Sequence, residues 1–125
     1  MMKNGNYRFE NLQVWKDAMV QTKELFILVR RANMENNYAF ASQFSRALIS
    51  ITNNIAEGSG SVSDREFANF LNMAHRSLFE CVSMLYLAEM EEFITKEERE
   101  KYRSGLAGVS KQIEGFRRHL VSKEK

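Results

Sequence analysis

The chain of 125 residues contains no proline and only one cysteine, Cys81. Because an interior proline would remove a backbone donor and clash with the preceding turn, its absence favours long unbroken helices. A single cysteine excludes an internal disulfide and gives no sign of an oxidising compartment. No apolar run approaches the roughly 20 residues that span a bilayer, and the N-terminus has no signal-peptide pattern. We therefore expect a cytoplasmic protein with no membrane partner.

The composition is otherwise that of an ordinary folded domain. Hydrophobic residues make up 44% of the chain, and 18 basic residues against 16 acidic ones leave a net charge of +2. This apolar fraction argues against wholesale disorder, and the length suits one domain. We expect a single domain over residues 1–125, with flexible ends at 1–9 and 122–125.

Apolar residues recur at steps of three and four in four stretches of the chain. Such spacing places them on one face of a helix, whereas strands would need a sustained period of two. The sets are Leu12, Trp15, Met19, Thr22, Phe26 and Val29; Phe44, Leu48, Ile51 and Ile55; Phe67, Leu71, Ala74, Leu78, Cys81, Leu85 and Ala88; and Tyr102, Leu106, Val109, Ile113, Phe116 and Leu120. Each set predicts one amphipathic helix.

Residues that favour helix ends set the expected boundaries. Ser63 with Glu66, and Thr95 with Glu98, have the spacing of capping boxes. An asparagine at 36 or 37 is suited to cap the second helix, and Gly58-Ser59-Gly60 predicts its end. We predict helices over Asn11–Asn33, Asn37–Glu57, Ser63–Glu91 and Thr95–Val121.

Short connections force consecutive helices to run antiparallel, and near-heptad apolar faces favour shallow crossing angles. The predicted fold is all-α, an antiparallel up-down-up-down four-helix bundle. The alternative is a three-helix core whose remaining helix is donated to a neighbouring chain.

The middle of the chain resembles the signature of a known family. The matching residues are Ser42-Gln43-Phe44-Ser45-Arg46-Ala47, Ser50-Ile51, Asn54-Ile55-Ala56-Glu57-Gly58-Ser59-Gly60, Ser63, Glu66-Phe67, Phe70-Leu71, Ala74 and Ser77-Leu78-Phe79-Glu80. These residues, with the opening Leu12 to Ala18, are similar to the four-helix bundle proteins encoded within intervening sequences of bacterial 23S ribosomal RNA genes. They also resemble the related accessory protein of diversity-generating retroelements.

The resemblance implies a homopentamer of antiparallel bundles. For the retroelement branch it implies a basic surface that binds nucleic acid, RNA or DNA, and a reverse transcriptase. The chain departs from the family pattern at Ser45, where a second arginine is usual, at Ser61, where a basic residue is common, and at Arg76, where glycine is usual.

The residues of the family motif have a structural and a functional interpretation. In the structural one, Gln43, Asn54, Glu57 and Glu80 fix the helix register, with Glu57 satisfying amides or pairing with Arg46, and Gly58 ends the helix. In the functional one, Asn54 and Glu57 are recognition residues at the end of the second helix.

Little in the sequence favours catalysis. The only histidines are His75 and His119, and neither follows a Glu by three residues, as a di-iron bundle requires. Ligand pairs typical of zinc sites are absent, and Cys81 falls on an apolar face, as an inert thiol would. We expect no metal, no cofactor and no enzymatic activity, although a deep polar pocket containing either histidine would favour an enzyme.

Charge is segregated along the second half of the chain. Residues 80–100 carry seven acidic and two basic side chains, and residues 101–125 carry seven basic and two acidic ones. Arg103, Lys111, Arg117 and Arg118 form a stripe on the predicted fourth helix, which could contact phosphates, remain a solvated face or pair with an acidic neighbour.

Three glycines interrupt the predicted fourth helix, where each costs about 1 kcal/mol relative to alanine. Gly105, Gly108 and Gly115 share one flank of that helix. We expect this flank to allow close backbone approach, either by a helix of the same bundle or by another subunit.

These observations favour a non-enzymatic oligomer, a pentamer by the family resemblance, that serves as a nucleic-acid or nucleoprotein-binding accessory module. Arg46 and the basic stripe of the fourth helix are its expected contacts. The alternative is a structural or protein-interaction scaffold that binds no nucleic acid.

Overall fold

The computed structural model describes residues 2–3 and 6–122 and has the predicted all-α fold. Its four helices are α1 (Gln13–Met34), α2 (Tyr38–Ser59), α3 (Asp64–Met90) and α4 (Lys96–Ser122). Every boundary lies within two residues of the prediction. Ahead of α1, strands β1 (Met2–Lys3) and β2 (Asn6–Tyr7) pair antiparallel and lead into a short 3-10 helix, Arg8–Asn11.

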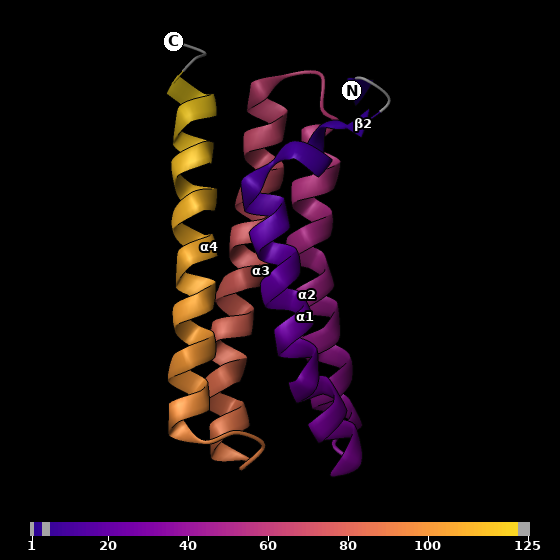
Figure 1. Ribbon diagram of the computed structural model, residues 1–125, viewed down its shortest axis with the longest axis vertical. Coiled ribbons are helices and arrows are strands. Elements are labelled where there is room, and N and C mark those ends of the chain that lie inside the picture. The colour runs from indigo at the N-terminus through magenta and orange to yellow at the C-terminus, as the bar shows by residue number, and fades with distance from the viewer. Residues whose placement is uncertain (1, 4–5, 123–125) are drawn as a thin grey trace.

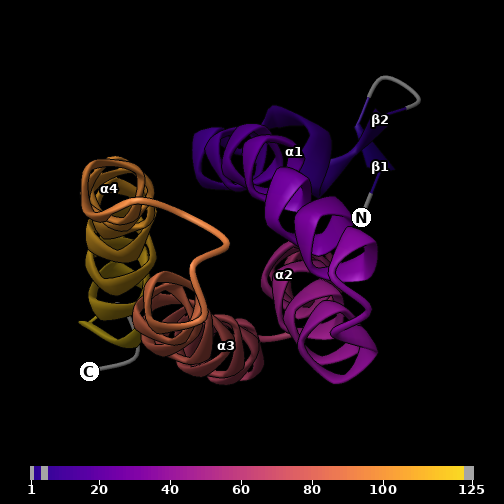
Figure 2. The ribbon, with the colours of Figure 1, turned by 90° about the horizontal axis from the view of Figure 1, so that it is seen from below.

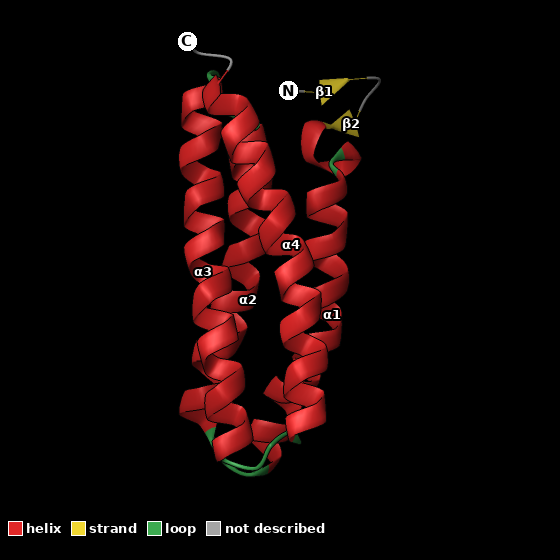
Figure 3. Cartoon of the chain, turned by 90° about the vertical axis from the view of Figure 1, so that its left-hand side faces the viewer, coloured by secondary structure: helices red, strands yellow, loops and turns green. Residues whose placement is uncertain are grey.

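The helices run alternately up and down and follow one another around the bundle (Figures 1 and 2). The α2–α3 and α3–α4 pairs pack most extensively, and α1 and α4 meet over the smallest contact. Figure 3 shows α1 and α4 as neighbours that complete the four-sided arrangement. Because all four helices pack within one chain, the alternative with a donated helix does not apply.

The predicted apolar faces of α2, α3 and α4 form the core. Every residue of these three sets is buried except Phe116, which is half-buried and packs against the core. Full burial of a Leu, Ile or Phe side chain contributes about 1.5–3 kcal/mol relative to exposure, so these faces supply most of the drive to fold.

The predicted face of α1 is wrong except at Thr22, which is buried as predicted. The residues buried in α1 are Val14, Ala18, Thr22, Leu25, Leu28 and Ala32. Met19 is 43% exposed, and Trp15 and Phe26 lie half-buried at the edges of the core. The run from Leu25 to Val29 is apolar on both sides of the helix, so periodicity alone supports two faces. The face with small Ala18 and Ala32 is buried because it permits a closer approach to the neighbouring helices.

Side chains cap three of the helices as expected. Asn37 accepts a hydrogen bond from the Phe40 amide (3.1 Å), and Ser63 accepts one from the Glu66 amide (3.1 Å). Thr95 forms the complete capping box with Glu98, because its hydroxyl accepts from the Glu98 amide (3.1 Å) while the Glu98 carboxylate accepts from the Thr95 amide (2.9 Å).

Gly58 does not end α2, contrary to the prediction. The helix continues through Ser59, and Gly60 follows it with a negative φ of −89°. A Cβ placed on Gly58 would lie 2.6 Å from the Phe70 Cβ and 2.9 Å from the Phe67 Cδ1. Glycine is therefore required for space, since the end of α2 lies directly against the first turns of α3.

The structure describes part of the predicted flexible ends. The β1–β2 pair and the Arg8–Asn11 helix occupy much of 1–9, and Ser122 is the last residue of α4. Residues 1, 4, 5 and 123–125 lie outside the described residues. Within residues 2–3 and 6–122, none of the helices has the length and apolar character needed to cross a membrane.

Gly58→Ala is expected to lower the free energy of unfolding by about 1–3 kcal/mol, because the new methyl group meets a Phe70 Cβ that is fixed to its backbone. This cost outweighs the gain of about 1 kcal/mol in helix propensity. Gly60→Ala is the control, since its Cβ would meet only the Glu57 carbonyl at 3.5 Å. Urea denaturation of both variants measures the difference, and equal stabilities would contradict this role of Gly58.

Candidate functional site: a polar seam and a cation belt

Six polar residues of the family motif meet along the outer junction of α2 and α3. We call this row the polar seam; it comprises Gln43, Arg46, Ser50 and Asn54 of α2 with Ser77 and Glu80 of α3. The Gln43 amide donates to the Glu80 carboxylate. Arg46 donates to the Gln43 amide oxygen (2.9 Å) and to the Ser42 hydroxyl. The seam thus connects the two helices that also pack most closely.

A second set of hydrogen bonds continues the seam toward the end of α2. The hydroxyls of Ser50 and Ser77 lie 2.8 Å apart. The Asn54 amide donates to the Ser50 carbonyl (2.8 Å) and to its hydroxyl (2.9 Å). Beside these residues lies an open groove of about 400 Å³, which Arg76 and Glu80 also line.

The expected pairing of Glu57 with Arg46 is wrong. The two residues are 11 positions apart on the same helix, a rise of about 16 Å, and Arg46 bonds to Ser42 and Gln43 instead. The Glu57 side chain is exposed and forms no hydrogen bond or ion pair within the part of the chain that the structure describes, although the Glu57 carbonyl accepts a hydrogen bond from the Gly60 amide (3.1 Å). Of the family-motif residues, Gln43, Asn54 and Glu80 lie in the seam, Gly58 in the helix contact and Glu57 in neither.

The predicted basic stripe of α4 consists of two paired and two unpaired cations. Arg103 binds the carboxylate of Glu100, and Arg117 binds that of Glu114 (2.6 Å). The arginine hydrogen bonds hold the pKa of both carboxyl groups below the ordinary value. Lys111 and Arg118 are exposed and form no hydrogen bond or ion pair among the described residues. The charge available to an external anion is therefore smaller than the sequence indicates.

Three cations from successive helices lie at similar height along the bundle. The Ser50–Ser77 contact sets α2 level with α3, and the His75–Ser110 contact (2.6 Å) sets α3 level with α4. Arg46 lies one turn from Ser50, Arg76 precedes Ser77, and Lys111 follows Ser110. All three cations are exposed, and none is paired with a carboxylate within the described residues. We call Arg46, Arg76 and Lys111 the cation belt.

Arg76 is the member of the belt that sequence reasoning missed. The sequence shows it only as a departure from the usual glycine of the family. Its position, one residue before Ser77 and four before Glu80, is the signal that could have placed it beside the seam.

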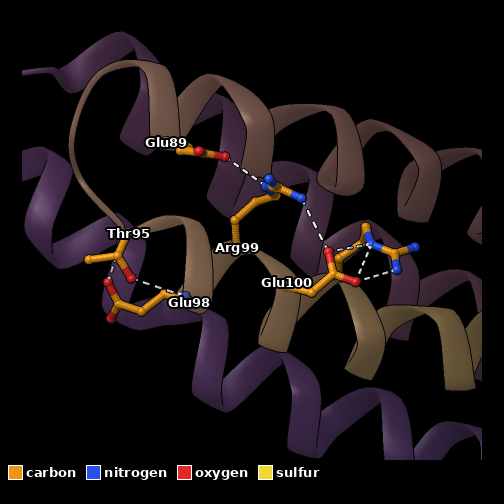
Figure 4. Close-up of polar contacts among 6 residues, drawn as sticks. Glu89, Thr95, Glu98, Arg99 and Glu100 are labelled. Carbon is orange, nitrogen blue, oxygen red and sulfur yellow. Dashed lines mark hydrogen bonds and ion pairs between the residues drawn. The ribbon is translucent and has the colours of Figure 1, made fainter.

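Three carboxylates at the acidic end of the bundle are paired with arginines of the same chain, namely Glu89, Glu98 and Glu100. Arg31 donates to the Phe93 carbonyl (2.9 Å) and forms an ion pair with Glu98 (3.0 Å), which ties α1 to the α3–α4 connection. Figure 4 shows Arg99 between Glu89 of α3 and Glu100 of α4, at 2.6 and 3.1 Å. These carboxylates are therefore partly neutralised before any other molecule approaches.

The three glycines of α4 have different surroundings. A Cβ on Gly105 would collide with the side-chain amide of Gln21 on α1, which is the flexible end of a side chain and can move aside, so the approach of α1 to α4 does not require this glycine. A Cβ on Gly108 or Gly115 would meet nothing within 4 Å, so neither serves close packing inside the chain. Contact of these two with another subunit stays a prediction.

The remaining candidate residues for chemistry are limited. Cys81 is fully buried, and burial raises the pKa of its thiol to about 12, which keeps it protonated. Across residues 2–3 and 6–122, no cluster of three or more His, Cys, Asp or Glu side chains is arranged to hold a metal ion.

The Arg31–Glu98 pair predicts a pH dependence of stability. The hydrogen bond from Arg31 holds the pKa of Glu98 below its ordinary 4.5, so the stabilisation is complete above that value and is lost as the pH falls through the folded pKa. Arg31→Gln should therefore lower the urea midpoint at neutral pH by more than it does near about pH 3. The exposed neighbouring variant Arg30→Gln is the control. If the urea midpoint of the wild-type chain exceeds that of Arg31→Gln by the same amount at every pH, the Arg31–Glu98 pair is not the source of the difference.

Comparisons with known proteins agree with the fold and identify the family. The family model described as 23S rRNA-intervening sequence protein matches residues 10–115. A solved structure of a protein with unknown function from the S23 ribosomal protein family of Bacteroides thetaiotaomicron superposes with a TM-score of 0.70 at 25% sequence identity, covering 80% of this chain and 94% of that one. The search of curated proteins finds no match. The chain therefore belongs to the family of 23S rRNA-intervening sequence proteins.

Proposed function

We propose that this chain is a non-enzymatic accessory module, located in the cytoplasm, that assembles with copies of itself and contacts a nucleic acid or nucleoprotein through the cation belt. The observation that carries the proposal is the placement of Arg46, Arg76 and Lys111 on three successive helices with no carboxylate partner among the described residues. Cations without internal partners release counterions when they meet phosphates, and this release drives electrostatic binding of nucleic acids.

The belt suits a phosphate backbone that crosses the helices rather than one that follows a single helix. Its members belong to α2, α3 and α4, and Arg118 adds a further cation two turns beyond Lys111 on α4. Arg46 is held toward the seam by neutral partners, so its charge is kept while its position is restrained. Glu80 and Glu114 flank the belt, and their negative charge limits its affinity for phosphates.

Self-assembly has support in a different part of the surface. Exposed apolar side chains occur on α1, where Val20 is 55% exposed beside Met19, and near the end of α3, where Leu87 is 41% exposed between Tyr86 and Met90. The two helices lie at opposite corners of the bundle (Figure 2). A ring of identical subunits needs two different complementary faces, and α1 and α3 supply one each. The homopentamer implied by the family resemblance is the ring that we propose.

The competing proposal is a protein-interaction scaffold with no nucleic acid. The pairing of Arg103 with Glu100 and of Arg117 with Glu114 favours it, because both ion pairs lower the charge that α4 offers to phosphates. A reverse transcriptase or another nucleoprotein as partner would combine the two functions.

Salt-titrated fluorescence anisotropy with a labelled RNA hairpin and a DNA duplex distinguishes these functions. We expect binding that weakens as salt rises, and each of Arg46→Gln, Arg76→Gln and Lys111→Gln should reduce the magnitude of the log–log salt slope by about one. Lys23→Gln, which removes an exposed cation from α1 outside the belt, is the matched control. Absence of binding at low salt, or belt variants that behave like Lys23→Gln, would eliminate the nucleic-acid proposal.

Sedimentation equilibrium tests the assembly. We expect a mass five times the 14.6 kDa of one chain. Val20→Glu and Leu87→Glu should each shift the mass toward the monomer, since either charge would have to be buried in a contact. Val62→Glu, at a 98% exposed position outside both faces, should leave the mass unchanged. A monomeric wild-type chain would contradict the ring.

A further inference from the structure

One serine of α4 has a histidine and a carboxylate arranged behind it. The Ser110 hydroxyl lies 2.6 Å from the His75 Nε2, and the His75 Nδ1 lies 3.5 Å from the Glu114 Oε2. Ser110 and Glu114 are one turn apart on α4, and His75 faces them from α3. A nucleophile within hydrogen-bond reach of a base, with a third group orienting that base, is the arrangement that activates serine hydroxyls.

The proposal requires the tautomer of His75 that carries its proton on Nδ1, the nitrogen 3.5 Å from the Glu114 carboxylate. With the proton on Nδ1, toward Glu114, the lone pair of Nε2 points at Ser110 and accepts its O–H. The imidazole ring is also held from the side by an edge contact with Phe79, at 4.9 Å between ring centroids. The His75 side chain is only 18% exposed, so its orientation is restrained on several sides.

The hydroxyl of Ser110 differs from four other helical hydroxyls among the described residues. A hydroxyl inside a helix commonly donates to a backbone carbonyl about one turn earlier. Four hydroxyls do so here, each to the carbonyl three residues earlier: those of Ser45, Thr52, Ser59 and Ser122. The hydrogen bond of Ser110 instead joins it to a base on a neighbouring helix. When Ser110 is the donor, this hydrogen bond increases the nucleophilicity of its oxygen.

Ser110 also borders a groove suited to an acyl group. The groove has a volume of about 190 Å³ and is lined by Leu78, Phe79, Val82 and Ala107 together with Arg103 and Ser110. The apolar side chains would hold a short hydrocarbon. The Arg103 Nη1 takes no part in the ion pair with Glu100, so this arginine can stabilise negative charge that develops on a carbonyl oxygen.

We propose that Ser110 is an activated nucleophile that accepts an acyl group from a thioester or another activated ester. Its oxygen attacks the acyl carbon, and His75 takes the hydroxyl proton. The bond from the acyl carbon to sulfur then breaks, and the departing thiolate takes the proton from His75. The products are an ester on Ser110 and a free thiol. This modification goes beyond the proposed binding function, does not depend on it and requires no turnover.

Labelling with an alkyl fluorophosphonate tests the proposal. An activated serine oxygen attacks the phosphorus of this reagent and displaces fluoride, so the reagent labels the same oxygen that would accept an acyl group. The chain is incubated with the reagent and the modified residue is located by peptide mass spectrometry. We expect Ser110 to be labelled at least about a hundred times faster than Ser104, an exposed serine on the same helix. The ratio of the labelling rate of Ser110 to that of Ser104 should fall to about one in concentrated urea, where the chain is unfolded and His75 no longer faces Ser110.

Variants identify the contribution of each group. His75→Gln should abolish the excess labelling, whereas His119→Gln, which removes the other histidine, should leave it unchanged. Glu114→Gln should slow the reaction by about tenfold, and Arg117→Gln, which breaks the Arg117–Glu114 pair but keeps the carboxylate, should not. Equal labelling of Ser110 and Ser104 in the folded wild-type chain would overturn the proposal without reference to any variant. Unchanged labelling of Ser110 in a folded His75→Gln chain would also overturn the proposal.

Discussion

The close contact between α2 and α3 is the constraint on which the remaining structure depends. At one end the two helices are so near that position 58 has no room for a side-chain carbon between it and Phe70. The shared apolar face of Phe44, Leu48, Ile51 and Ile55 packs against α3 along the rest of their length. This contact fixes the rotation of each helix, and therefore which residues face outward.

The outward residues of this pair form the polar seam, and the seam sets the height of the cation belt. Gln43 reaches Glu80 and Ser50 reaches Ser77 only because the helices are held in one register. The same register places Arg76 near the middle of the bundle, between Arg46 and Lys111. On α4, by contrast, neighbouring glutamates bind Arg103 and Arg117. In the function that we propose, the cations without a carboxylate partner therefore matter more than the net charge.

The sequence predicted the helices and three of the four core faces because polar residues interrupt the apolar ones at regular steps in α2, α3 and α4. It misplaced the face of α1, where Leu25 to Val29 are all apolar and two helical faces are equally consistent with the pattern. It also assigned Gly58 to a helix end, since a glycine needed for space and one needed for a turn look alike in a sequence. The contact between His75 and Ser110 joins positions 35 residues apart, and no local pattern marks it.

Native-state amide hydrogen exchange tests most directly whether the α2–α3 contact is the stable frame of the molecule. Amides in the middle of α2 and α3, such as those of Ile51 and Leu71, should exchange only through global unfolding. Amides of α1 and α4 should open at lower free energies, because these helices meet each other over the smallest contact in the bundle. If amides of α2 or α3 exchange through openings of lower free energy than the openings of α1 and α4, the α2–α3 contact is not the stable frame of the molecule.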